Sequence, residues 1–223
     1  ATTEAWAQFS VAGPNARKLL EKVVDQDISD GAFPYMGAGN ITVCGGLRAR
    51  LFRISFSGEL SFEVNVPSNA GSHVWKALMA AGAEFNITPY GTEAMHVLRA
   101  EKGYVIVGQE TDGTVTPVDL GMDWIIGKRK PDFIGRRGLA RPDIKAPGRK
   151  QLVGLLTTDP AGVLEEGAQI VEDAKQPIPL RMLGHVTSSY MSPALGRSIA
   201  LALVAGGRGR IGQICVDGGQ REA

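Results

Sequence analysis

The segment FRISFSGELSFEV, residues 52–64, indicates the fold more clearly than any other part of the chain. Apolar and polar residues alternate on both sides of Ser57-Gly58-Glu59, which is the pattern of two strands joined by a tight turn. Successive side chains of a strand point to opposite faces, so Glu63 points away from Phe62. Glu63 therefore lies either in solvent or in a polar pocket, and solvent is the commoner environment for a glutamate on a strand.

The first part of the chain shows alternating strand and helix patterns. Strands are expected over residues 7–11 and 41–44, and a helix is expected to open at Gly13-Pro14. Further helices are expected from Ser68 and from Thr92, because both residues can cap a helix amino terminus. This order predicts an α+β fold in which helices pack on one side of an antiparallel sheet.

The second part of the chain contains strand patterns without helices between them. The strands are expected at residues 151–156, 169–172, 180–190, 198–204 and 213–216. Consecutive strands of this kind predict a sandwich or a small antiparallel β-barrel. Between residues 127 and 148 the apolar periodicity falls and Lys, Arg, Pro and Gly increase. We therefore expect a first domain over residues 1–126, a linker over 127–148 and a barrel domain over 149–223.

Composition excludes several classes of function. The chain has 223 residues, 43% of them hydrophobic, and a formal net charge of +1, so it can bury a core but gives no electrostatic case for a nucleic-acid partner. Its two cysteines and three histidines are scattered, which predicts no metal site and fits a reducing cytoplasmic location. The sequence has no apolar run of membrane-spanning length, so no membrane partner is expected.

One glycine-rich segment matches the dinucleotide-binding fingerprint by its letters alone. GRGRIG, residues 207–212, even follows a predicted strand. The fingerprint needs a helix that begins at the glycines and offers its amino-terminal N–H groups to a pyrophosphate. Because a strand is expected over residues 213–216 instead, we interpret the segment as a turn.

Five segments of the chain resemble the folate-binding family of the glycine cleavage T-protein. They are FSGE at 56–59 with Glu63 after it, GTEAMHVLRAEKGYVIVGQE at 91–110, TPVDLGMDW at 116–124, DFIGRRGL at 132–139 and GHVTSSYMSPALGRSIALALV at 184–204. Together they extend over nearly the whole chain. The resemblance implies a ferredoxin-like half of the folate-binding fold, followed by a small antiparallel β-barrel.

The same resemblance implies a set of folate-binding residues. Glu63 stands where the family hydrogen-bonds the pterin, and a carboxylate can accept two adjacent N–H donors together. Phe56, Tyr104 and Trp124 would supply ring contacts, although ordinary core packing is the alternative for Tyr104 and Trp124. Arg99 is expected to be an internal salt-bridge partner rather than a folate ligand.

Within this family, AMHVLRAEKGY at residues 94–104 is most similar to the carboxy-terminal part of sarcosine oxidase alpha subunits. This similarity implies a tetrahydrofolate-binding module that traps the one-carbon unit from oxidative demethylation of sarcosine as 5,10-methylenetetrahydrofolate. FAD, FMN, NAD and further subunits of the hetero-oligomeric oxidase would then bind elsewhere in the parent complex. The T-protein has Arg and Asp where Met95 and His96 stand, and an uncharged Met cannot hold a carboxylate as Arg would.

Two alternatives remain at this point. One is a T-protein-like aminomethyltransferase, and the other is a non-catalytic folate-binding or assembly module. Iron-sulfur assembly factors of the superfamily have a cysteine that is missing here between Lys102 and Gly108, which argues against that role. The catalytic Asp of the relatives belongs to an upstream segment, so no catalytic residue is assigned. We therefore expect a fragment of an oxidoreductase that lacks a complete active site by itself.

Overall fold

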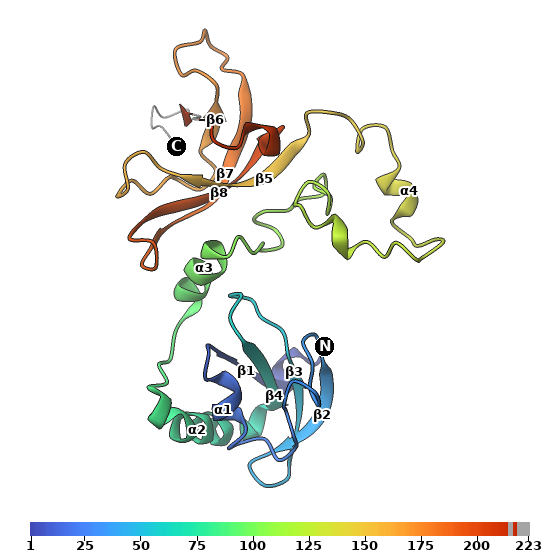
Figure 1. The fold of residues 1–223 in the computed structure, drawn as a ribbon, viewed down its shortest axis with the longest axis vertical. Coiled ribbons are helices and arrows are strands. Elements are labelled where there is room, and N and C mark those ends of the chain that lie inside the picture. Colours follow the sequence, from blue (N-terminus) through green and yellow to red (C-terminus); the bar gives the residue numbers. More distant parts are fainter. Residues whose placement is uncertain (214–215, 218–223) are drawn as a thin grey trace. The chain divides into compact units, whose positions relative to one another are not determined.

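The computed structural model describes residues 1–213 and 216–217, and the chain divides into two compact units (Figure 1). The first unit comprises Ala1–Leu98 and the second Arg99–Ala223. The division falls within helix α3 (Thr92–Glu101). Residues 127–148 contain one short helix, α4 (Arg136–Leu139), between loops. The domain and linker boundaries expected at residues 126 and 149 stay predictions.

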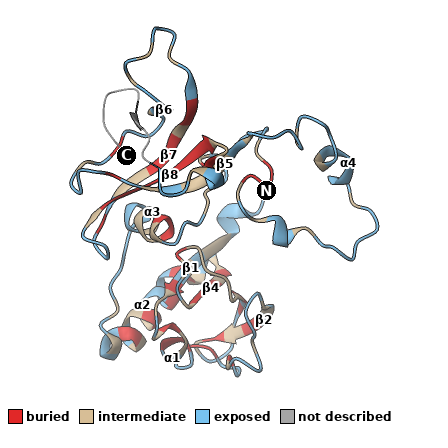
Figure 2. Cartoon of the chain, turned by 45° about the horizontal axis from the view of Figure 1, so that its top comes forward, coloured by how far each residue is buried: buried red, intermediate tan, exposed pale blue. Residues whose placement is uncertain are grey.

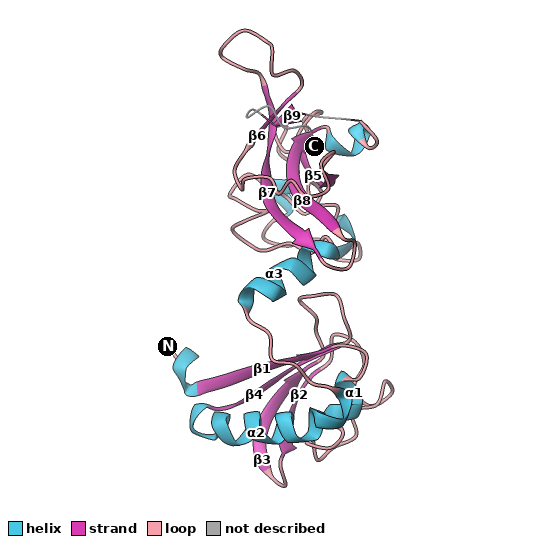
Figure 3. Ribbon diagram, turned by 90° about the vertical axis from the view of Figure 1, so that its left-hand side faces the viewer, coloured by secondary structure: helices cyan, strands magenta, loops and turns pink. Residues whose placement is uncertain are grey.

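The first unit is a four-stranded antiparallel sheet with two helices on one face (Figure 3). The strands are β1 (Trp6–Ala12), β2 (Ala38–Val43), β3 (Leu47–Phe52) and β4 (Ser61–Pro67), in the order β1-β4-β3-β2. Helices α1 (Ala16–Leu20) and α2 (Gly71–Gly82) pack against each other and against β4. The α+β fold expected from the sequence is confirmed.

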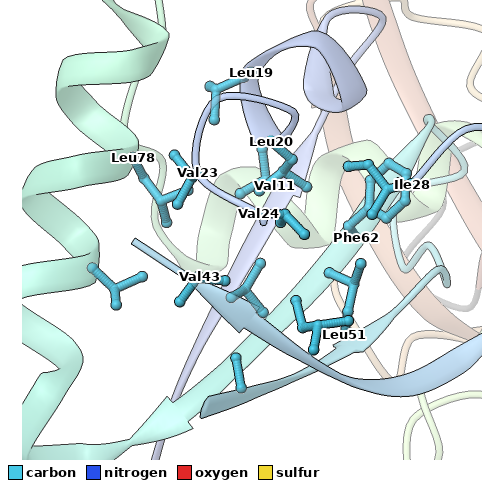
Figure 4. Close-up of a cluster of buried hydrophobic side chains, with 14 of the residues drawn as sticks. Val11, Leu19, Leu20, Val23, Val24, Ile28, Val43, Leu51, Phe62 and Leu78 are labelled. Atoms are coloured by element: carbon cyan, nitrogen blue, oxygen red, sulfur yellow. The ribbon is translucent and has the colours of Figure 1, made fainter. Parts of the chain in front are cut away.

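The core of the first unit lies between the two helices and the sheet (Figure 4). Phe62, Val64 and Val66 project into it from β4 and are fully buried. Leu20 and Val74 meet them from α1 and α2. Because these β4 residues are two positions apart, the residues between them, Glu63 among them, face the other side of the sheet. Burial of this apolar surface fixes which face Glu63 occupies.

The connection between β3 and β4 differs from the sequence expectation. The predicted tight turn at residues 57–59 is wrong, because β3 already ends at Phe52 and residues 53–60 form an eight-residue connection. Arg53 is held elsewhere: its N–H donates to the Gly37 carbonyl, and its guanidinium donates to the Phe33 carbonyl and pairs with Asp30 at 2.7 Å. These bonds to residues 30–37 take the backbone out of the ladder with β4.

The second unit is built on a five-stranded antiparallel sheet. Its strands are β5 (Lys150–Leu156), β6 (Gln169–Val171), β7 (Met182–Ser192), β8 (Arg197–Ala205) and β9 (Val216–Asp217), in the order β5-β8-β7-β6-β9. The antiparallel β domain is thus confirmed, and in the described part of the chain β5 and β9 form the two open edges. Buried residues concentrate along β7 and β8 (Figure 2). Residues 214–215 of the strand expected at 213–216 lie outside the described residues.

Short 3₁₀ turns connect the main elements, at Thr3–Ala5, Ser68–Ala70, Ala83–Phe85, Asp123–Ile125 and Gly207–Arg210. The last of these turns covers most of the GRGRIG segment. It is one 3₁₀ turn followed by extended and turn residues, and no α-helix starts at the glycines. The expectation that this segment forms a turn is confirmed. Within residues 1–213 and 216–217, the chain has no helix long and apolar enough to cross a membrane.

Candidate functional site

Glu63 occupies a central position on the open face of the first sheet. It lies in the middle of β4, with Ser10 of β1 opposite it on one side and Phe52 of β3 on the other. The side chain is half-buried. Among the described residues, neither of its carboxylate oxygens has a hydrogen-bond or ion-pair partner. This acid therefore has two acceptor oxygens available to a ligand.

Burial raises the pKa of the Glu63 carboxyl above its ordinary value. The physical cause is desolvation: the neighbouring strands remove water from the carboxylate, and no donor in the described chain replaces it. A ligand that offered N–H donors would replace the hydrogen bonds to water that burial removes from the carboxylate. The arrangement suits recognition of a donor edge more than it suits stability of the sheet itself.

The rest of the open face combines rings with polar groups. The β4 residues that share this face with Glu63 pair with Trp6 and Gln8 on β1 and with Arg50 on β3. The Arg50 guanidinium lies 4.4 Å from the centre of the Trp6 ring, a cation–π contact that leaves the charge at the surface. Helices α1 and α2 do not cover this side, because they pack on the core face.

A groove of about 570 Å³ runs along β1 at the edge of the same sheet. Its wall is mainly apolar and comes from β1, the turn after it, α1, α2, the chain after α2 and the start of α3; it includes Phe9, Trp75, Leu78, Phe85, Tyr90 and Met95. Ser10 lines the groove and also stands opposite Glu63. Glu63 itself is one strand away from the groove and does not line it.

The other residues implied by the resemblance lie at exposed or half-exposed positions. Phe56 is half-buried in the connection 53–60, next to the buried Ser57. Tyr104 and Trp124 belong to the second unit, where their side chains are 40% and 72% exposed. Ordinary core packing, the alternative considered for these two rings, is therefore wrong. Their roles as ring contacts for folate stay predictions.

Arg99 forms the internal salt bridge that was expected of it. Its Nη1 lies 2.9 Å from Oε2 of Glu110, and both side chains are fully buried. Ser188 of β7 joins the pair, accepting from Arg99 Nη2 at 2.6 Å and donating to Glu110 Oε1 at 2.5 Å. Sequence reasoning did not single out Glu110 or Ser188. One available signal for Glu110 was that it is an acidic residue in the same segment, 91–110, as the basic Arg99.

The described residues offer no site for a metal ion. Within residues 1–213 and 216–217, no three His, Cys, Asp or Glu side chains are grouped so that they could hold one. Cys44 is a free, half-buried thiol in the first unit, and Cys215 lies outside the described residues.

Two family models match the chain in succession. The model of the GCVT N-terminal domain matches residues 1–130, and that of the glycine cleavage T-protein C-terminal barrel domain matches residues 150–221. The chain therefore belongs to the glycine cleavage T-protein family.

Individual relatives show which members of this family the chain resembles. The chain is 52% identical over 215 residues to the sarcosine oxidase subunit alpha of Corynebacterium sp. (strain P-1), and 46% identical over 212 residues to that of Rhizobium meliloti (strain 1021). Each match covers 95% of this chain but only 22% and 21% of the relative, so the chain spans about a fifth of these subunits. It is 31% identical to an aminomethyltransferase of Clostridium botulinum (strain Okra / Type B1), over 94% of this chain and 54% of that protein.

A solved structure has the same fold. The glycine cleavage system aminomethyltransferase T from Bartonella henselae matches 97% of this chain and 57% of that chain with a TM-score of 0.76. The sequence identity is 19%, so this likeness concerns the fold alone.

Proposed function

We propose that this chain is the tetrahydrofolate-binding module of a sarcosine oxidase alpha subunit. The identity to such subunits, 46–52% over 95% of the chain, supports the class of parent protein. The observation that carries the binding role is Glu63, a half-buried carboxylate with a raised pKa and free oxygens on the open face of the first sheet. The parent would be an oxidoreductase with further subunits, flavins and NAD bound outside this chain.

Tetrahydrofolate, when bound, accepts the one-carbon unit produced by oxidation of the sarcosine N-methyl group, giving 5,10-methylenetetrahydrofolate. The task of this chain is to hold and orient it. The two oxygens of Glu63 accept from the adjacent 2-amino and ring N–H groups of the pterin, a charge-assisted pair of hydrogen bonds. Phe56, on the connection that leads into β4, provides an apolar surface for a flat ring.

Tyr104 and Trp124 are proposed as further ring contacts because their side chains are exposed although they are large and aromatic. Exposed aromatic rings with few rotatable bonds are effective binding groups. The catalytic base is not assigned to a residue of this chain. A cytoplasmic location is part of the proposal.

The aminomethyltransferase alternative has weaker support. The chain is 31% identical to the Clostridium botulinum aminomethyltransferase, against 52% to the Corynebacterium oxidase subunit. Met95 contributes to the apolar groove of the first unit, where a cationic side chain would change the ligand that the groove could accept.

Calorimetric titration with 5-formyltetrahydrofolate, a stable reduced folate, tests the proposal. Loss of the charge-assisted hydrogen bonds in Glu63→Ala should weaken binding by about 1.5–3 kcal/mol, or roughly 10- to 150-fold. Glu21→Ala, which removes an exposed carboxylate of the same unit, is the matched control and should bind as the wild type does. Equal affinity of Glu63→Ala and the wild type, or no binding by the wild type, would refute the proposal.

A further inference from the structure

Residues 102–110 form a loop between α3 and the rest of the second unit, and this loop bears Tyr104. It contains Gly103 and Gly108 at φ values of 69° and 96°, a backbone region that favours glycine. The loop contains no strand, and turn hydrogen bonds, such as that from the Gly103 N–H to the Ala100 carbonyl, satisfy only part of its main chain. The other main-chain groups need further partners wherever they are buried.

At Tyr104 and Ile106 these partners are two charged residues, Arg99 before the loop and Glu110 at its end. The N–H of Tyr104 donates to the Arg99 carbonyl at 2.9 Å, and the Tyr104 carbonyl accepts from Arg99 Nη1 at 3.1 Å. The N–H of Ile106 donates to Glu110 Oε2 at 2.7 Å. Arg99 and Glu110 thus hold the main chain on both sides of Val105, while the ring of Tyr104 stays 40% exposed.

Arg99 and Glu110 together form a clamp on the loop, and a residue of β7 anchors this clamp. Ser188 accepts a hydrogen bond from Arg99 and donates one to Glu110, so each charged side chain has a second anchor. Arg99, Glu110 and Ser188 are all fully buried. A buried ion pair adds little stability compared with well-packed apolar residues of the same volume, whereas it does specify a geometry. Its effect here is to specify the path of the loop.

We propose that Arg99 and Glu110 are positioning residues that hold the Tyr104 ring in place for an aromatic ring of the bound folate. The inference rests on the proposed function, because it takes folate as the ligand of Tyr104. A main chain that is already ordered before binding loses less conformational freedom when the ligand arrives. The ion pair acts on the ligand through Tyr104 and does not touch it.

A double-mutant cycle tests this inference on the full chain. Glu110→Gln keeps the size of the side chain but removes its charge and one acceptor oxygen. We expect it to weaken 5-formyltetrahydrofolate binding about tenfold in the wild-type background and less than about twofold in the Tyr104→Ala background. The same loss in both backgrounds would overturn the inference, because a general structural defect does not depend on the Tyr104 ring.

Amide hydrogen exchange provides a readout without folate. In Glu110→Gln the Ile106 amide should exchange at least about tenfold faster. The Val186 amide of β7, which donates to the carbonyl of Ala168 just before β6, should keep its protection and report that the fold is intact. Glu165→Gln, an exposed carboxylate of the same unit, is the matched control. Unchanged exchange at Ile106 would overturn the clamp.

The two readouts separate the possible failures. If the wild type does not bind the folate but Ile106 exchange responds as expected, the proposed function is wrong and the clamp stands. If Glu110→Gln does not fold, Ser188→Ala takes its place. This change removes the bridging hydroxyl and keeps both charges, and the same outcomes at Ile106 and in the cycle with Tyr104→Ala apply to it.

Discussion

Two glutamates in the two units have opposite environments. Glu110 in the second unit is fully buried and bonded to Arg99, to the Ile106 amide and to Ser188. Glu63 in the first unit is half-buried, and no donor in the described chain reaches its carboxylate. The first carboxylate organises the backbone of its own chain. The second is desolvated without a compensating donor, and under the proposed function the ligand would supply that donor.

Removal of the Glu110 carboxylate should give the largest effect on stability. Glu110→Leu leaves the buried Arg99 guanidinium without its counter-charge, which costs about 3–5 kcal/mol. The double variant Arg99→Met/Glu110→Leu should recover most of that loss, because no unpaired charge remains. Urea unfolding monitored by circular dichroism measures both. A loss below about 1 kcal/mol in the single variant would show that the pair is solvated and that the contrast with Glu63 is wrong.

Asp119 should give an intermediate effect. Burial alone would raise the pKa of its carboxyl, but hydrogen bonds from Arg149 and Thr116 outweigh burial and lower it. A lowered folded-state pKa means that its stabilisation is present at neutral pH and is lost as the pH falls through that pKa. Asp119→Asn should therefore lower stability by about 1–3 kcal/mol at pH 7, and by less in acid.

Unfolding of Asp119→Asn and the wild type across the pH range checks this expectation. A difference in the free energy of unfolding between the two proteins that increased as the pH fell would contradict the expectation. Asp143→Asn is the control, because Asp143 pairs with Arg141 at an exposed position and such pairs contribute little.

Glu63 should give the smallest effect on stability, with the opposite sign. Its folded-state pKa is raised, so the charged form is disfavoured in the folded protein, and stability falls as the pH rises through that pKa. Glu63→Gln should therefore stabilise the chain slightly at pH 7, by about 0.5 kcal/mol or less because solvent still screens the group. The gain should disappear in acid. Thermal unfolding of both proteins at pH 4 and pH 7 measures this difference. A variant less stable than the wild type at pH 7 would contradict the expectation and would mean that Glu63 has an internal partner.

The sequence was informative where local periodicity decides the structure. Alternation around Phe62 correctly placed Glu63 on the face opposite the core, and most strands of both sheets lie at or close to the expected residues. The exception is β3, because a strand was expected immediately before Ser57 and the structure forms it over Leu47–Phe52 instead. The connection 53–60 could not be foreseen, because Arg53 is drawn out of the ladder by residues 30–37, which are distant in sequence. The same limit applied to Ser188, which joins Arg99 from 89 positions further along the chain.

In the proposed complex, the Glu63 carboxylate pairs with the donor edge of a reduced folate. Carbon-13 NMR of the glutamate carboxyls, assigned with the Glu63→Gln variant, measures the pKa of Glu63 in the free and the folate-bound chain. Hydrogen bonds to a charged carboxylate favour its charged form, so saturation with 5-formyltetrahydrofolate should lower a pKa that burial raises in the free protein. A pKa that stays the same or rises further on binding would contradict the claim.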